Sequence, residues 1–129
     1  MTEISDAALV AALRRQMTVA AAKQVVAAGN LANVDTPGFK ARELDFAATL
    51  DESLASTLAT THPGHLQAAG QAGPATQEAR NLSTRRDGNT VQIDRELLAM
   101  TRASGDFARA QTALAAKFRL VRYAISESR

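Results

Sequence analysis

The two histidines of the chain stand close together in the stretch His62-Pro63-Gly64-His65, and imidazoles at this spacing could bind a metal ion or transfer a proton. A metal site needs further ligands, and the nearest suggested carboxylate, Glu78, lies across a tract rich in glycine and proline. A Pro-Gly turn fixes no ligand geometry by itself. We therefore interpret the histidine pair as part of a solvated turn, and we expect no metal.

Other chemical motifs are equally scarce. The chain has no cysteine, which excludes disulfides, thiolate ligands and cysteine nucleophiles. No Gly-x-Ser-x-Gly elbow, Gly-x-Gly-x-x-Gly fingerprint or phosphate loop occurs. Asn81-Leu82-Ser83 matches the glycosylation sequon, but no secretion signal accompanies it. Asp94 and Glu96 are better interpreted as dipole partners at the start of a helix. The sequence predicts no enzyme and no cofactor.

The composition indicates a chain that needs partners to complete its core. Its 129 residues are enough for one domain, and hydrophobic residues make up 46%. Many of these are alanines, aromatics account for only 4% and tryptophan is absent, so little apolar area can be buried. The net charge is +2 and the basic residues do not form one block. With so few aromatics to stack on bases, nucleic-acid binding is not expected.

The pattern of apolar residues favours two long helices. The first runs from Ile4 to about Asn33, and the second runs toward the C-terminus, with glycine at Ser104-Gly105 as its weak point. Apolar residues spaced alternately by three and four follow the repeat of a coiled-coil seam. We predict a mainly α fold in which these terminal helices pack as an antiparallel coiled-coil-like pair, one discontinuous helical domain built from residues 1–35 and 89–129. The predicted seams comprise Val10, Leu13, Met17, Ala20, Gln24, Ala27 and Leu31, and Ile93, Leu97, Met100, Ser104, Phe107, Gln111, Leu114, Phe118, Val121 and Ile125.

The seams also suggest a register. If the polar residues Gln24 and Gln111 meet across the pair, Val10 lies opposite Ile125 and Leu31 opposite Ser104. A single polar residue in a seam is able to specify register in this way.

The middle, residues 36–88, is predicted to be irregular or weakly β. Glycines and prolines across residues 53–80 favour a flexible loop. A helical turn over Leu44–Leu58 is suggested by the capping box Thr49-Leu50-Asp51-Glu52. The Asp87-Gly88 turn signal is consistent with a small hairpin between Asn81 and Ile93.

A definite stop ends the first helix. Proline disfavours the α region for the residue before it, so the helix must end ahead of Thr36. Pro37 followed by Gly38 predicts a type II turn, in which glycine supplies the positive φ. Asn33 tolerates the left-handed conformation and is the expected helix end.

The residues around this stop resemble the N-terminal signature of the bacterial flagellar rod and hook proteins. The resemblance is closest to the proximal basal-body rod members. It extends through Arg42–Phe46, Thr61–His65, Gly88–Val91, Glu96 and Lys117–Ile125. Ser104-Gly105-Asp106 departs from it, because the family tends to keep better helix formers there. The residues that carry the signature, here an expected assembly motif, are Asn30, Ala32, Asn33, Thr36, Pro37, Gly38, Phe39 and Lys40.

The resemblance implies a structural subunit that polymerises helically into the drive shaft and export channel wall of the basal body. It implies a periplasmic location reached through the flagellar type III export apparatus, and no cleavable signal peptide or bilayer-spanning run is recognised. The implied partners are copies of itself, other rod subunits, the rod adaptor and membrane-ring proteins. The chain is expected to leave the helix stop through Phe39–Arg42 toward the next subunit. Two alternatives remain, a helical export cofactor or chaperone-type binding module, and a small hydrolase using His62 or His65.

Overall fold

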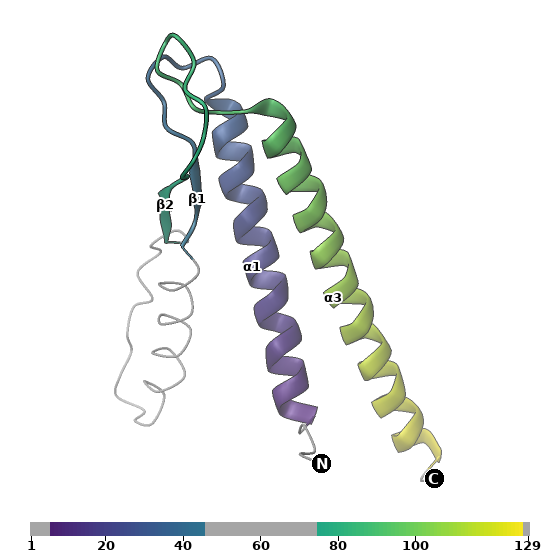
Figure 1. The fold of residues 1–129 in the computed structure, drawn as a ribbon. Coiled ribbons are helices and arrows are strands. Elements are labelled where there is room, and N and C mark those ends of the chain that lie inside the picture. The colour runs from purple at the N-terminus through teal and green to yellow at the C-terminus, as the bar shows by residue number, and fades with distance from the viewer. Residues whose placement is uncertain (1–5, 46–74, 128–129) are drawn as a thin grey trace, which may run out of the picture.

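The computed structural model describes residues 6–45 and 75–127, and these form a mainly helical fold. Helix α1 (Asp6–Ala32) and helix α3 (Ile93–Glu127) pack against each other in opposite directions, as predicted. Strand β1 (Arg42–Leu44) follows α1, and strand β2 (Thr76–Glu78) pairs with it. Figure 1 shows the two helices close together at the end that carries the connecting segments and farther apart toward the first turn of α1 and the last turn of α3.

Helix α1 ends with a different capping interaction from the one predicted. Asn33 does not adopt the left-handed conformation, since the described non-glycine residue with a positive φ is Asn81. Instead, the Asn33 side chain donates a hydrogen bond back to the carbonyl oxygen of Gly29 (2.9 Å). Its backbone N–H donates to the carbonyl oxygen of Asn30 (3.0 Å), which tightens the last turn. The helix stops where expected, but a side-chain cap ends it.

Helix α3 is continuous. It passes through Ser104-Gly105 without interruption, although glycine inside a helix costs about 1 kcal/mol relative to alanine. A Cβ added at Gly105 would meet no atom within 4 Å, so no tertiary contact requires glycine there.

The core is thin, in agreement with the composition. The buried apolar residues of the helix pair are Ala20 and Ala27 on α1, and Ala103 and Ala110 on α3. Alanine buries little area, but its small side chain lets two helix backbones approach closely. Val91, just before α3, is the largest apolar side chain that the described residues bury completely.

The predicted seam agrees with the burial on α1 and only in part on α3. Its seven residues on α1 are all buried or half-buried. On α3, Met100, Phe107 and Leu114 are half-buried, but the other seven seam residues are exposed. A row that lies one position before Leu97, Ser104, Gln111 and Phe118 is covered instead. This rotates the contact face by about 50° around the helix axis. The exposed seam residues are Ile93, Leu97, Ser104, Gln111, Phe118, Val121 and Ile125, and the covered row is Glu96, Ala103, Ala110 and Lys117.

Two physical causes account for this rotation. Alanines in the covered row of α3 allow closer packing against the alanines of α1 than the larger residues of the predicted row would. In addition, Glu96 is turned toward α1 by a hydrogen bond from Asn30 (3.0 Å).

The predicted register is wrong. Asn30 contacts Glu96, so Gln24, six residues earlier on α1, lies at the level of a residue about six positions after Glu96 in the antiparallel helix. Gln111 is therefore roughly nine residues, or about 13 Å, farther along α3. A polar contact at the loop end sets this register, and the two glutamines do not meet. The pairs predicted from the same register, Val10 with Ile125 and Leu31 with Ser104, are shifted with them.

The sheet also differs from the hairpin that was predicted. The turn before α3 does form, with Gly88 at φ +82° and its N–H donating to the carbonyl oxygen of Arg85 (3.0 Å). Residues 81–92 nevertheless contain no strand, and the antiparallel pair lies between β1 and β2, with Glu43 opposite Gln77. Part of the tract expected to be a flexible loop is thus strand β2.

Several predictions fall on residues that the structure does not describe. Most of the helical turn suggested over Leu44–Leu58 lies outside the described residues, as do both His62 and His65. Among the helices that are described, none combines the length and apolar character needed to cross a membrane.

Candidate functional site

The turn that follows α1 has the form predicted from Thr36-Pro37-Gly38. Gly38 adopts φ +74°, which an L side chain rarely tolerates, and the N–H of Phe39 donates to the carbonyl oxygen of Thr36 (3.2 Å). A Cβ added at Gly88 would lie 3.4 Å from Cα of Gly38, so the two glycine turns are packed together. The helix stop is therefore one half of a two-turn joint.

Asn89 closes the end of α1 from the other half of this joint. Its side chain is fully buried (0% exposed), and Nδ2 donates to the carbonyl oxygens of Asn33 (3.0 Å), Val34 (3.1 Å) and Thr36 (2.8 Å). Oδ1 accepts a hydrogen bond from the N–H of Val91 (2.7 Å). Carbonyls at and just beyond a helix C-terminus lack intrahelical partners. One side chain, more than fifty positions away in the sequence, supplies those partners here.

Asn30 links three elements. It is 3% exposed, and its amide matches the backbone of Arg42, with Oδ1 accepting from the Arg42 N–H (2.9 Å) and Nδ2 donating to the Arg42 carbonyl oxygen (2.8 Å). Nδ2 also donates to Glu96 Oε2 (3.0 Å), and Glu96 is itself only 5% exposed. Every hydrogen-bonding group of the Asn30 amide is thereby used to hold α1, β1 and α3 together.

The chain folds back along α1 after the turn. Ala41 is fully buried, and its N–H donates to Oγ1 of Thr90 (2.9 Å), whose own N–H donates to the carbonyl oxygen of Phe39 (3.1 Å). The N–H of Gly38 donates to the carbonyl oxygen of Asp87 (2.9 Å). Within this chain, these hydrogen bonds and the contact of β1 with α1 hold Phe39–Arg42 against the helix pair. The predicted contact of this segment with the next subunit stays a prediction.

The predicted assembly motif divides into an inner and an outer part. Asn30 is buried, and Asn33 and Phe39 are half-buried in the joint. The remaining residues form an exposed outer rim, although Lys40 Nζ donates to the carbonyl oxygen of Gly88 (3.0 Å). The exposed members of the motif are Ala32, Thr36, Pro37, Gly38 and Lys40.

The site prediction did not include the residues that hold the motif in place. Asn89, Thr90 and Glu96 are polar and buried, and each bonds to the chain around the helix stop. The sequence position of Asn89 and Thr90 could have indicated a structural role, since they directly follow a turn and precede an apolar helix. What they contact could not be deduced, because the partners are about fifty or more positions away.

Comparisons with known proteins match this chain to one family. Residues 7–40, which contain α1 and the turn, match the family model of the flagella basal body rod protein. Over 101 residues the chain is 37% identical to the flagellar basal body rod protein FlgB of Salmonella typhimurium, covering 67% of this chain and 72% of the relative. The FlgB proteins of Escherichia coli and Aeromonas hydrophila are 36% and 35% identical, again over 72% of their length.

The similarity is not confined to the short signature. It spans about two thirds of this chain, well beyond the residues that match the family model. The chain belongs to the FlgB family of flagellar basal body rod proteins.

Proposed function

We propose that this chain is a structural subunit of the proximal rod of the flagellar basal body, and that it polymerises helically into the drive shaft and the wall of the export channel. Membership of the FlgB family supports the rod assignment directly. The alternative of an export cofactor or chaperone has no support from the comparisons. A catalytic role is no part of the proposal, because the family is structural.

The proposed helical assembly rests on one observation. The helix pair buries only alanines as its apolar core, while ten of its large apolar side chains are 39–65% exposed. Contiguous exposed apolar surface on a protein marks an interaction site, and apolar residues on several sides of a helix indicate that neighbours surround it. A non-closing contact between different surfaces of successive subunits would produce a helical polymer. The exposed residues are Leu9, Val25, Ile93, Leu97, Leu98, Phe118, Leu120, Val121, Tyr123 and Ile125.

The neighbours proposed are further copies of the chain on some of these surfaces and other rod subunits on the rest. The rod adaptor, the membrane-ring proteins and the type III export apparatus are proposed as contacts at the base of the rod, in keeping with the family resemblance. The exposed rim of the joint, around Pro37 and Lys40, is a suitable contact surface because the hydrogen bonds beneath it hold its backbone in one conformation.

The proposal is tested by replacing one exposed apolar residue in the source bacterium. Leu120 is 64% exposed, so Leu120→Glu should leave the fold of the isolated chain intact and prevent rod assembly. Leu120→Met is the matched control, because it keeps apolar character at similar size. Each variant is expressed in a strain lacking the gene, and swimming in soft agar and electron micrographs of isolated basal bodies are scored. Normal rods in the deletion strain, or normal rods with Leu120→Glu, would contradict the proposal.

A further inference from the structure

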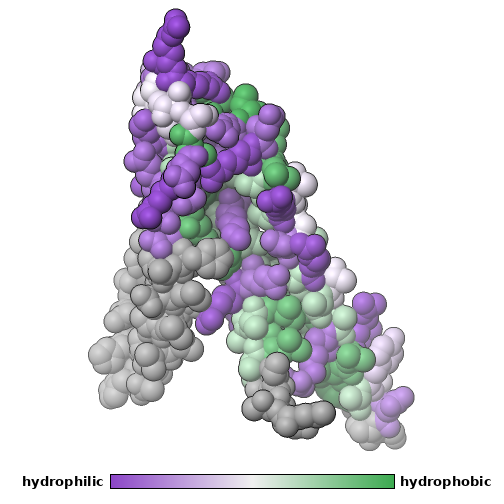
Figure 2. Space-filling model, viewed as in Figure 1, coloured by the Kyte–Doolittle hydropathy of each residue, from purple (hydrophilic) through white to green (hydrophobic). Residues whose placement is uncertain are grey.

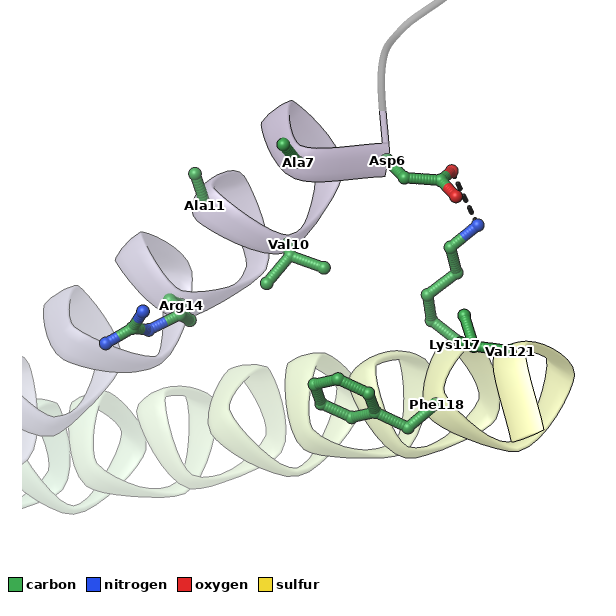
Figure 3. A pocket seen from close by; sticks show the side chains of 8 residues that line it. All are labelled: Asp6, Ala7, Val10, Ala11, Arg14, Lys117, Phe118 and Val121. Atoms are coloured by element: carbon green, nitrogen blue, oxygen red, sulfur yellow. Dashed lines mark hydrogen bonds and ion pairs between the residues drawn. The ribbon is translucent and has the colours of Figure 1, made fainter. Parts of the chain in front are cut away.

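A groove lies between the N-terminal half of α1 and the C-terminal half of α3. Two adjoining hollows of about 370 and 700 Å³ share Val10, Arg14 and Phe118 in their walls. Figure 3 shows side chains from both helices converging on the first hollow, with the Asp6–Lys117 ion pair (2.6 Å) across its end. On α1 the lining residues of the larger hollow run from Val10 to Ala21, which is about 17 Å of helix. We call this surface the open-end groove.

The floor of the open-end groove is apolar. Val10, Met17, Phe107 and Leu114 are half-buried, and Phe118 is 58% exposed. Figure 2 shows apolar side chains gathered over this end of the helix pair. A concave apolar surface between two helices has the form of a site for a third helix, because helices pack at interaxial distances of 8–10 Å with side chains interdigitated.

Basic residues predominate around the groove, and Asp6 is the acidic residue among those that line the two hollows. Residues 7–34 contain three basic residues and no Asp or Glu, and residues 107–126 contain four basic residues and no Asp or Glu. Within the groove, Lys117 is paired with Asp6, and Arg14 lies in the wall of both hollows. The seven basic residues are Arg14, Arg15, Lys23, Arg109, Lys117, Arg119 and Arg122.

The basic charge around the groove helps to identify which molecule binds there. If the basic halves of these helices in a second copy entered the groove, they would bring cations against cations. The first half of α3 offers a second copy no acidic face, since Glu96 is buried against Asn30 and Asp106 pairs with Arg109, which leaves Asp94 in the first turn as its exposed carboxylate. An anionic bilayer would match the charge, but a flat surface cannot reach a concave floor between two helices.

We propose that the open-end groove binds an amphipathic helix of another protein, with an apolar stripe against Val10, Met17, Phe107 and Phe118 and acidic residues toward Arg14. This proposal rests on the rod function above in making the chain part of an assembly of several proteins, and it adds the chemistry of one partner. The apolar stripe supplies the affinity, and the acidic flank selects this helix over the basic helices of a second copy.

The test measures binding of a defined probe to the purified full-length chain. The probe is a fluorescent synthetic helix of about 18 residues, long enough to fill the groove, with leucines on one face and glutamates on the other. One comparison peptide has lysines in place of the glutamates, and a second has the same composition in scrambled order. Fluorescence anisotropy should show saturable binding of the acidic helix, at least tenfold weaker binding of the lysine helix and no saturable binding of the scrambled peptide.

Two matched charge reversals localise the site. Arg14→Glu reverses a charge in the groove and should weaken binding of the acidic helix about tenfold, corresponding to about 1.4 kcal/mol. Arg102→Glu reverses an exposed charge on α3 outside the groove and should change binding less than about twofold. Phe118→Ala should weaken binding several-fold with an unchanged far-ultraviolet circular dichroism spectrum, since its side chain is largely exposed.

Other occupants give different results, each of which would overturn the proposal. Self-association in sedimentation velocity that disappears with Phe118→Ala would assign the groove to a second copy. Binding to vesicles containing anionic phospholipid, without binding of the acidic helix, would assign it to a membrane surface. Equal binding of the acidic and lysine helices, or equal effects of Arg14→Glu and Arg102→Glu, would remove the charge argument.

The outcome in cells separates this proposal from the rod function. If the deletion strain lacks rods and Arg14→Glu restores them fully, and the acidic helix does not bind, the groove proposal fails and the rod function stands. If the deletion strain builds normal rods, the rod function fails, whatever the purified chain binds.

Discussion

Asn89→Ala should be among the most destabilising single changes in the joint. The replacement removes the Nδ2 donor shared by the carbonyl oxygens of Asn33, Val34 and Thr36, and the Oδ1 acceptor of the Val91 N–H. It also leaves a space in a fully buried position. The end of α1 and the start of α3 would lose their common partner.

The magnitude follows from the hydrogen bonds lost. An amide has two hydrogens, so the three contacts of Nδ2 amount to about two full hydrogen bonds, and Oδ1 adds a third. Each net hydrogen bond is worth about 1 kcal/mol, and the Val91 N–H, left unpaired beside a fully buried side chain, adds a further penalty. The sum is about 3–4 kcal/mol, a large part of the roughly 5–15 kcal/mol that stabilises a typical domain.

Urea unfolding followed by circular dichroism measures this loss. The midpoint should fall for Asn89→Ala while the slope stays unchanged, as expected for a change in stability alone. Asn89→Asp keeps an acceptor for Val91 but cannot donate to the three carbonyls, so it should destabilise the chain at least as much. Gln111→Ala, an exposed change on α3, is the control and should stay within about 0.5 kcal/mol of the parent.

Hydrogen exchange provides the local measurement. The N–H of Val91 should lose protection in Asn89→Ala, because its acceptor has been removed. A loss of less than about 1 kcal/mol with Val91 still protected would refute the view that this asparagine holds the joint together.

Three further predictions concern the same fold. In a double-mutant cycle of Asn30→Ala and Glu96→Ala, unfolding in urea should show a coupling energy of about 1 kcal/mol or more, because either single change leaves a buried polar group unpaired; additive effects would contradict this. Gly38→Ala should lower stability by about 1–2 kcal/mol through its positive φ, which thermal unfolding would detect as a reduced Tm, and an unchanged Tm would argue against this turn. Gly29→Ala and Gly105→Ala should each raise stability by about 0.5–1 kcal/mol in the same assay, because both lie in helices with no atom near the added methyl group; a lowered Tm would indicate a contact that the structure lacks.

The local features of this fold could be predicted because neighbouring residues encode them. Helical periodicity indicated both long helices, and the restriction that Pro37 imposes on its predecessor placed the stop after α1. The positive φ of Gly38 and the turn before Gly88 likewise depend on residues within a few positions. The alanine-rich composition was sufficient to predict a thin core.

The candidate site was only half predictable. The motif residues Asn30 and Asn33 were identified, but their roles depend on Glu96 and Asn89, which the topology brings to them from the far side of the middle segment. Whether a polar residue caps a helix, faces solvent or bonds a distant backbone depends on that geometry.

The sequence by itself therefore determined the two helices, the turn that separates them and the shortage of buried area, since these follow from composition and from the φ, ψ preferences of adjacent residues. The tertiary structure alone decided which face of α3 meets α1, in which register, and where the chain goes after Gly38. An alanine-rich seam packs almost equally well in several rotations and registers, because its side chains are small and alike. The choice between them is made by specific polar contacts over long sequence distances, above all Asn30 with Glu96 and Asn89 with the end of α1.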